Sequence, residues 1–312
     1  MLPLLRAIRA SLPQARVDLL IHYPVAELLE QTTGNLLNRI WHYHQVQLLR
    51  KPWRLISFFR QIRKQRYDVV ITSHNPDNFS LSQALAGRFF APRCFIGFRH
   101  GDSPHFYHIA VPSSTDKHYA DAMVDLWRVI APGSRCEFGG LEIPPHILRK
   151  VKEKLHTEMG ISPAAPRVLF WLGATGNKIL PPAAVEWVYR ILQQRKNLPF
   201  LLAAGPADRE VLKKYPLEIA ENTILWEAPL VETAAFFSLF DLFISPDTGP
   251  MHLAVAVGCQ TFTLFVDSNI RQYGYQQEPK YHAVQWQENS ATRTRLTRLL
   301  EEKLAQLTPV GK

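Results

Sequence analysis

The first half of the chain alternates between short continuous apolar runs and longer segments in which apolar residues follow a helical spacing. The continuous runs, which predict buried strands, are VDLLIH (17–22), YDVVITS (67–73) and CFIGF (94–98). The helical segments are LPLLRAIRASLPQ (2–14), AELLEQTTGNLLNR (26–39) and SLSQALAGRFF (80–90), the last closed by Gly87. Apolar strands in alternation with helices predict a parallel sheet that is covered on both faces.

The second half repeats this pattern with clearer boundaries between elements. Apolar runs predict strands at RVLFWLG (167–173), PFLLAAG (199–205), DLFISP (241–246) and TFTLFV (261–266). Helical spacing and helix-boundary residues predict helices at PPAAVEWVYRILQQ (181–194), AFFSLF (235–240) and PMHLAVAV (250–257). We therefore predict an α/β protein with two doubly wound, Rossmann-like parallel-sheet domains, and a ligand cleft at the carboxyl ends of the strands.

A polar helix at 146–160 is followed by the proline-bearing segment ISPAAP, which predicts a boundary between domains. We expect a first domain at 1–160 and a second at 161–290. The remaining residues, 291–312, predict a C-terminal helix that packs back on the first domain.

Composition excludes several classes of protein. A chain of 312 residues with 46% hydrophobic side chains is long enough for two cored domains and too apolar for disorder. Its three widely spaced cysteines, Cys94, Cys136 and Cys259, predict reduced thiols and no disulfide scaffold. No apolar run approaches the length of a membrane span, and Arg6 and Arg9 make the N-terminal segment a poor signal peptide. We therefore expect a cytoplasmic protein.

Charge is shared unevenly between the two halves. Residues 1–150 hold 19 Lys and Arg against 11 Asp and Glu, whereas the remainder holds 17 against 16. Seven cations without an acid occur in one segment, at Arg50, Lys51, Arg54, Arg60, Arg63, Lys64 and Arg66. Three aromatic residues are interleaved with them, which suits a phosphorylated lipid, a membrane surface or nucleic acid. A solvated helix face beside core aromatics is the alternative.

The segment SPDTGPMHLAVAVG (245–258) carries the most specific candidate chemistry. A predicted strand runs into Asp247-Thr248-Gly249, and a helix begins at Pro250. The N–H groups of that first turn and the helix dipole favour an anion, and Gly249 permits a phosphate to approach the backbone. Thr248 can add a hydroxyl, and Asp247 can cap the turn. An ordinary N-cap is the alternative interpretation.

The stretch DTGPMHLAVAVGCQTFTLF (247–265) resembles the signature of the lipopolysaccharide core heptosyltransferases, the ADP-heptose-using transferases of glycosyltransferase family 9. Further segments that resemble the family follow in the expected order: PLLRAIRASLPQARVDLLI, YDVVIT, IGFRH, DKHYADAMVDLWRVI, LGATGNKILPPAAVEWV and LLAAGPADREV. The resemblance covers nearly the whole chain. It implies the GT-B fold, with an acceptor-binding first domain and a nucleotide-sugar-binding second domain.

The resemblance also implies a donor site in the second domain. Lys178 takes the place of the family's phosphate-facing lysine, and it follows a predicted strand, as a point charge for phosphate should. A surface lysine is the alternative. The other donor-site residues that the resemblance implies are Ala174, Thr175, Asp208 near a ribose, Ala228 near the adenine, Asp247, Thr248 and Gly249 at the diphosphate, and His252. Leu180 and Phe265-Val266 depart from the family's Trp and Phe-Gly, which leaves sugar and base specificity open.

The largest departure from the family lies at the start of the chain. The family opens with a strand and a Gly-Asp turn whose Asp is regarded as the general base, whereas Met1 aligns just beyond that turn. We therefore expect the first domain to lack its central strand and the base. Either the start codon lies upstream, or the first domain has adapted. Asp77 and Asp102 are the candidates for a replacement base, and each also suits a turn or cap, so the catalytic residue is unassigned.

The expected function is inverting transfer of L-glycero-D-manno-heptose from ADP-heptose to the phosphorylated inner core of lipopolysaccharide, at the inner face of the inner membrane. The resemblance implies no metal and no other cofactor, and no nucleic acid as a partner. Two alternatives stay open. A silent ADP-sugar binder would bind nucleotide without turnover, and a basic polyanion- or membrane-binding protein would ignore ADP.

Overall fold

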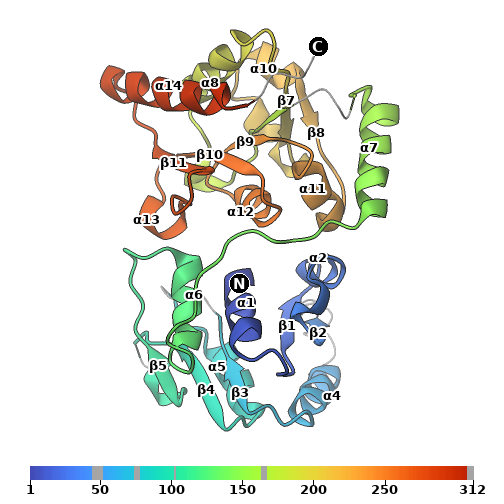
Figure 1. The fold of residues 1–312 in the computed structure, drawn as a ribbon, viewed down its shortest axis with the longest axis vertical. Helices are drawn as coiled ribbons and strands as arrows, with labels where there is room; N and C mark the ends of the chain where they lie inside the picture. The colour runs from blue at the N-terminus through green and yellow to red at the C-terminus, as the bar shows by residue number, and fades with distance from the viewer. Residues whose placement is uncertain (44–51, 74–77, 102, 163–166, 308–312) are drawn as a thin grey trace. The chain divides into compact units, whose positions relative to one another are not determined.

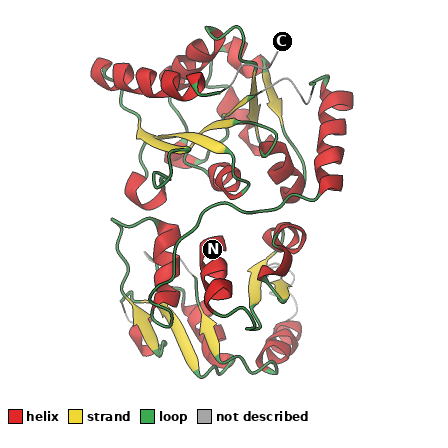
Figure 2. Cartoon of the chain, in the orientation of Figure 1, coloured by secondary structure: helices red, strands yellow, loops and turns green. Residues whose placement is uncertain are grey.

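The computed structural model describes residues 1–43, 52–73, 78–101, 103–162 and 167–307. The chain forms two compact units, unit 1 (Met1–Phe138) and unit 2 (Gly139–Lys312), each with helices around parallel strands (Figures 1 and 2). The first domain ends earlier than the predicted boundary at 160. The reason is that the polar helix α7 (Pro145–Met159) packs in unit 2, where its Lys150 Nζ lies 2.7 Å from Glu232 Oε1.

Among its described residues, unit 2 has six parallel strands in the order β11-β10-β9-β6-β7-β8. The strands are β6 (Val168–Trp171), β7 (Phe200–Ala204), β8 (Thr223–Leu225), β9 (Leu242–Pro246), β10 (Gln260–Phe265) and β11 (Tyr281–Gln285). The helices after α7 are α8 (Pro182–Gln193), α9 (Arg209–Leu212), α10 (Leu217–Glu221), α11 (Leu230–Phe237), α12 (Gly249–Ala256), α13 (Ile270–Tyr273) and α14 (Ser290–Ala305). Every residue of β6 and β9 is buried, as expected of strands covered on both faces.

The C-terminal helix α14 corrects a second expectation about domains. Its apolar stripe of Leu296, Leu300 and Leu304 is buried in the hydrophobic core of unit 2. Trp187 of α8 also donates a hydrogen bond from Nε1 to Thr297 Oγ1 over 2.9 Å. The apolar stripe of α14 is therefore covered within unit 2 itself.

Unit 1 has two separate groups of parallel strands among its described residues, β1-β2 and β3-β4-β5. The strands are β1 (Asp18–His22), β2 (Arg39–Tyr43), β3 (Val69–Ile71), β4 (Cys94–Phe98) and β5 (Ile109–Val111). The helices are α1 (Leu2–Ser11), α2 (Val25–Thr32), α4 (Pro52–Arg63), α5 (Leu81–Phe89) and α6 (Tyr119–Arg128). The core lies between β4, α1 and α6, with Ile96, Met123 and Leu126 fully buried.

Two local predictions in unit 1 are wrong. The helix predicted at 26–39 ends at Thr32, and residues 39–43 form β2, a short strand with one buried side chain. Gly87 does not close its helix, because α5 continues to Phe89. A Cβ at Gly87 would lie 2.1 Å from Cζ of Phe95, so this glycine lets α5 approach β4 closely.

Candidate functional site

The predicted donor-site residues lie in four loops of unit 2, each at the carboxyl end of a strand. Residues 174–178 follow β6, Asp208 follows β7, Ala228 follows β8, and residues 247–252 follow β9. Because β6 lies between β9 and β7 in the sheet, these loops are neighbours in space. The chain runs from β6 to β7 and β8 on one side and then returns to β9 on the other side of β6. This reversal makes the edge a topological switch point, the usual ligand position in such sheets.

An ion pair joins the loops that follow β6 and β9. Lys178 Nζ lies 2.8 Å from Asp247 Oδ2, and the side chains of Lys178 and Asp247 are 36% and 1% exposed. Among the described residues, no donor makes a hydrogen bond of standard geometry to the Asp247 carboxylate. Asp247 therefore does not cap the following helix; it is a buried carboxylate that holds the lysine ammonium at the surface of the switch point.

The turn between β9 and α12 offers backbone donors. Thr248 has an extended backbone at φ −143° and ψ 168°, and its side chain makes no cap hydrogen bond. Pro250 has no N–H, and the Met251 N–H donates to the Thr248 carbonyl over 3.1 Å. The N–H groups of Thr248 and Gly249 have no acceptor among the described residues. The anion-binding part of the turn is therefore smaller than the whole first turn that the sequence suggested.

Open space lies beside this turn. A Cβ built on Gly249 would meet no atom within 4 Å, so the glycine leaves room for a ligand against the backbone. The Thr248 hydroxyl lies 3.5 Å from the Pro246 carbonyl oxygen, a distance too long to hold it firmly. Two backbone N–H groups, a hydroxyl and the Lys178 ammonium can therefore meet one anion.

Asp208 links the loops that follow β6 and β7. Its Oδ2 accepts a hydrogen bond from the Gly205 N–H over 2.9 Å. Burial raises the pKa of Asp208, and hydrogen bonds from the backbone of Gly205 and Ala174 oppose that shift. Gly173 was not predicted: a Cβ there would lie 2.1 Å from Asp208 Oδ2, so the glycine makes room for the carboxylate. Asp208 thus already has backbone donors before any ribose binds.

His252 makes its contact in the first turns of α12. Its Nδ1 lies 3.0 Å from the Tyr275 hydroxyl, and the two rings pack edge to face. Burial lowers the pKa of His252; the Lys178 charge lowers it further, and the Asp247 carboxylate opposes both. The imidazole is therefore neutral at pH 7 and has no charge with which to pair an anion. Tyr275 was not predicted, because nothing in its sequence surroundings distinguishes it from a core tyrosine.

The remaining donor-site residues frame this edge of the sheet. Ala174 is buried and Thr175 is exposed, and the following turn passes through Gly176 at φ +61°, which favours glycine. Asn177 Nδ2 donates to the Asp267 carboxylate and ties this loop to the end of β10. Ala228 is partly buried, and it directly precedes the first turn of α11.

Part of the predicted basic segment gathers around a cavity in unit 1. Arg50 and Lys51 lie outside the described residues, and Arg54 is exposed on α4 without lining the cavity. We call this cavity of about 740 Å³ the basic cavity; its charged lining residues are Arg60, Arg63, Lys64, Arg66, Asp68 and Arg93. Arg93, which was not predicted, lies 3.4 Å from Asp68. The cavity lies at the amino ends of β3 and β4, the edge opposite to that where parallel sheets bind substrates.

The aromatic residues of the same segment have different roles. Phe58 and Phe59 pack against a small core that includes Trp41, whereas Trp53 is 66% exposed. Core aromatics and a cation-lined cavity therefore occur together in this segment.

Other predicted groups are not placed. Asp77 and Asp102, the candidates for a replacement base, lie outside the described residues. Within the ranges that the structure describes, no three His, Cys, Asp or Glu side chains gather as metal ligands. In those same ranges, no helix combines the length and the apolar character that crossing a bilayer requires.

Two parallel α/β units, one of which has a lysine and a glycine-containing helix start at its switch point, are the arrangement of the GT-B fold. Residues 55–303 match the family model described as glycosyltransferase family 9 (heptosyltransferase). The chain belongs to glycosyltransferase family 9.

Solved structures have the same fold. A family 9 glycosyltransferase from Veillonella parvula is 17% identical with a TM-score of 0.72, over 96% of this chain and 86% of that chain. E. coli ADP-heptose LPS heptosyltransferase II is 16% identical with a TM-score of 0.69, over 97% and 94% of the two chains. E. coli heptosyltransferase WaaC with ADP gives the same four values. No curated protein gives a significant sequence match.

Proposed function

We propose that this chain transfers L-glycero-D-manno-heptose from ADP-heptose to the lipopolysaccharide inner core, with inversion at the anomeric carbon. The observation that carries the proposal is the Lys178–Asp247 ion pair beside the Thr248–Gly249 turn, at the switch point of a family 9 chain. Solved relatives of this fold include an E. coli enzyme named for ADP-heptose and another with ADP, which supports an ADP-sugar donor.

The donor diphosphate is assigned to the open space beside Gly249. The N–H groups of Thr248 and Gly249 donate to it, and Lys178 supplies the positive charge. Negative charge accumulates on the diphosphate as the bond to the sugar breaks, so fixed donors at this position stabilise the transition state more than the substrate. Asp208 and Ala228 lie on the side of β7 and β8, where the ribose and adenine are assigned.

The acceptor hydroxyl attacks the anomeric carbon from the face opposite the diphosphate, and a carboxylate removes its proton. That carboxylate is unassigned. The missing assignment favours one alternative, a silent homologue that binds an ADP-sugar without turnover. No metal and no other cofactor enter the proposal.

The basic cavity is assigned to the phosphorylated acceptor or to the surface of the inner membrane. Its position at the amino ends of β3 and β4 suits a role in anchoring phosphates and not in activating the reacting hydroxyl. A net charge of +9, mostly from the first half, supports peripheral association of a cytoplasmic protein with anionic lipid. The further alternative is a protein that binds polyanions and has no donor site. The turn at Thr248–Gly249, with its backbone donors, argues against this alternative.

The direct test incubates the purified chain with ADP-heptose and a panel of truncated lipopolysaccharide acceptors, and measures by mass spectrometry the gain of one heptose. A gain that depends on the donor, and that is lost in Lys178→Met, supports the proposal. ADP binding without any gain identifies the silent homologue. Neither binding nor gain, with intact binding of anionic vesicles, identifies the polyanion binder.

A further inference from the structure

The turn that follows β8 in unit 2 is held by the helix α7. We call residues 226–229 the β8 turn. Lys154 of α7 donates a hydrogen bond from Nζ to the carbonyl oxygen of Glu227 over 2.8 Å. The same Nζ lies 4.9 Å from the centre of the Trp226 ring, and that ring stacks on Phe236 with 4.1 Å between the ring centres. One lysine therefore contacts two successive residues of the β8 turn.

The other contacts of the β8 turn come from β7 and α11. The Trp226 N–H donates to a carbonyl oxygen of β7 over 2.9 Å, and its Nε1 donates to Thr233 Oγ1 over 3.1 Å. Thr233 lies in α11, and its hydroxyl donates in turn to the Pro229 carbonyl over 3.1 Å. Both ends of the turn are thus fixed. Between them, the Glu227 carbonyl has Lys154 as its only donor among the described residues.

The hydrogen bond from Lys154 also sets the direction of a backbone donor. The Glu227 carbonyl and the Ala228 N–H belong to one trans peptide unit, in which the two groups point in opposite directions. Because the carbonyl points to Lys154, the Ala228 N–H points away from it. This N–H has no acceptor among the described residues. An ammonium on the carbonyl oxygen also polarises the peptide unit and makes its N–H a stronger donor.

Ala228 is the residue beside which the adenine of the donor is assigned, so the inference rests on the proposed function. Pro229 follows Ala228, and a residue before proline favours an extended backbone. In an extended residue the N–H and the carbonyl point to the same side. Adenine has an acceptor, N1, beside its 6-amino donor, which matches this pair of groups. A 6-oxopurine has the reverse order, with N1–H beside an acceptor oxygen.

A second lysine of α7 separates positioning of the turn from attachment of the helix. Lys150 lies four residues before Lys154, on the same face of α7. Its Nζ lies 2.7 Å from Oε1 of Glu232, whose side chain is 8% exposed. This partner belongs to α11 and not to the β8 turn. Lys150 therefore joins α7 to α11, whereas Lys154 contacts the turn itself.

We propose that Lys154 is a positioning residue for recognition of the base. It fixes the Glu227–Ala228 peptide unit so that the Ala228 N–H donates to N1 of adenine. Lys154 acts through this peptide unit and not through its own charge on the diphosphate. The choice of adenine over a 6-oxopurine is thus set in part by α7.

The test measures by calorimetry the affinity of the full chain for ADP and for inosine diphosphate. Inosine diphosphate differs from ADP in its 6-oxo group and its N1–H, so the parent chain should prefer ADP. Lys154→Met should weaken ADP binding about three- to tenfold, as expected for one neutral hydrogen bond, and change inosine diphosphate binding less than about twofold. Lys154→Arg keeps a donor for the Glu227 carbonyl and should restore the preference for ADP.

Lys150→Met is the matched control on the same helix. It should lower the midpoint of urea unfolding, because the buried Glu232 carboxylate loses its partner, and it should keep the parental preference for ADP. An unchanged preference in Lys154→Met overturns this inference and does not affect the proposed function. Equal weakening of both nucleotides in Lys154→Met, or the same loss of preference in Lys150→Met, also overturns it. A parent chain that does not prefer ADP overturns the ADP donor of the proposed function together with this inference.

Discussion

The ion pair between Lys178 and Asp247 gives the sharpest prediction about the donor site, because it separates a structural role from a binding role. The Lys178→Met variant removes the ammonium and keeps most of the side-chain volume. It leaves the Asp247 carboxylate, which is 1% exposed, without an ionic partner. Loss of one partner of a fully buried pair costs about 3–5 kcal/mol. Since Lys178 is 36% exposed and partly screened, we expect a loss of about 2 kcal/mol.

The Asp247→Asn variant completes a double-mutant cycle. The amide carries no charge, so in its presence Lys178→Met should cost less, by a coupling free energy of about 1–2 kcal/mol. Urea unfolding, followed by tryptophan fluorescence for each of the four proteins, measures this coupling.

ADP affinity should follow a different pattern across the same cycle. A charge-assisted contact to the diphosphate contributes roughly 1.5–3 kcal/mol, so Lys178→Met should weaken ADP binding about 10- to 100-fold. In the double variant, Asp247→Asn should recover part of the free energy of unfolding that Lys178→Met removes. ADP binding, measured by calorimetry, should stay weak. Parental ADP affinity in Lys178→Met would refute the donor-site assignment. Fully additive unfolding free energies would refute the structural role of the pair.

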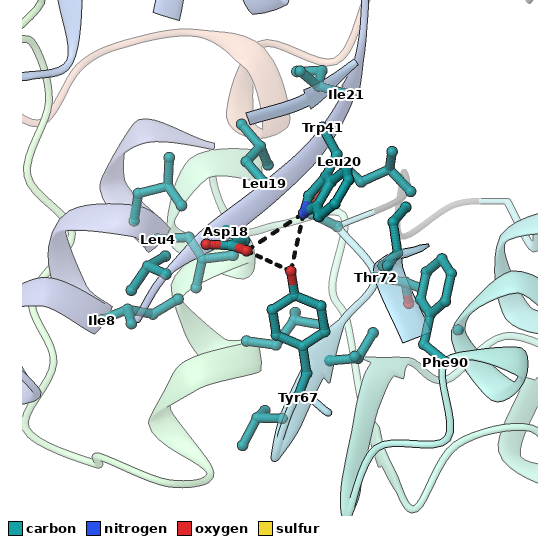
Figure 3. A pocket seen from close by; sticks show the side chains of 18 of the residues that line it. Leu4, Ile8, Asp18, Leu19, Leu20, Ile21, Trp41, Tyr67, Thr72 and Phe90 are labelled. Carbon is teal, nitrogen blue, oxygen red and sulfur yellow. Dashed lines mark hydrogen bonds between the residues drawn. The ribbon is translucent and has the colours of Figure 1, made fainter. Parts of the chain in front are cut away.

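Three further predictions concern unit 1. Gly87→Ala should destabilise the protein by about 1–3 kcal/mol in urea unfolding, because the new Cβ would lie 2.1 Å from a fully buried Phe95 ring. Burial, reinforced by the hydrogen bond to Asp18 (Figure 3), raises the pKa of Tyr67 to about 12. Tyr67 therefore contributes stability that is complete below its unfolded pKa of about 10 and is lost as pH rises towards 12. In Tyr67→Phe, the fall in the free energy of unfolding between these two pH values should be smaller. Charge reversal of Arg60 and Arg63 should weaken binding to anionic vesicles by about 1 kcal/mol or more per residue at low salt.

Each of these three has a matched control. Gly133→Ala tests the general cost of losing a glycine, since no atom lies within 4 Å of its Cβ position. Tyr43→Phe, at the end of β2, provides a second tyrosine of unit 1 for the alkaline profile. Two charge reversals on α14 produce the same change in net charge outside the basic cavity, and they are the control for the vesicle-binding prediction. Equal effects in a variant and its control would contradict the corresponding prediction.

Much of the fold was predictable because buried parallel strands have a simple signature. The apolar runs that become β6, β7, β9 and β10 are bounded by proline, glycine or charge, and the structure places strands at all four. β2 was missed because residues 39–43 have only one buried side chain, and they continue the spacing of the preceding helix. The position of α14 was also missed, because an apolar stripe predicts that a helix is packed without identifying what covers it.

The residues of the candidate donor site could be named from the sequence, but their arrangement could not. Lys178 and Asp247 are distant in sequence, and they meet because β6 and β9 are neighbours in the sheet. Strand order is not encoded in the local pattern of either segment, so the ion pair, and with it the orientation of Lys178, required the structure. The contact between His252 and Tyr275 required it for the same reason.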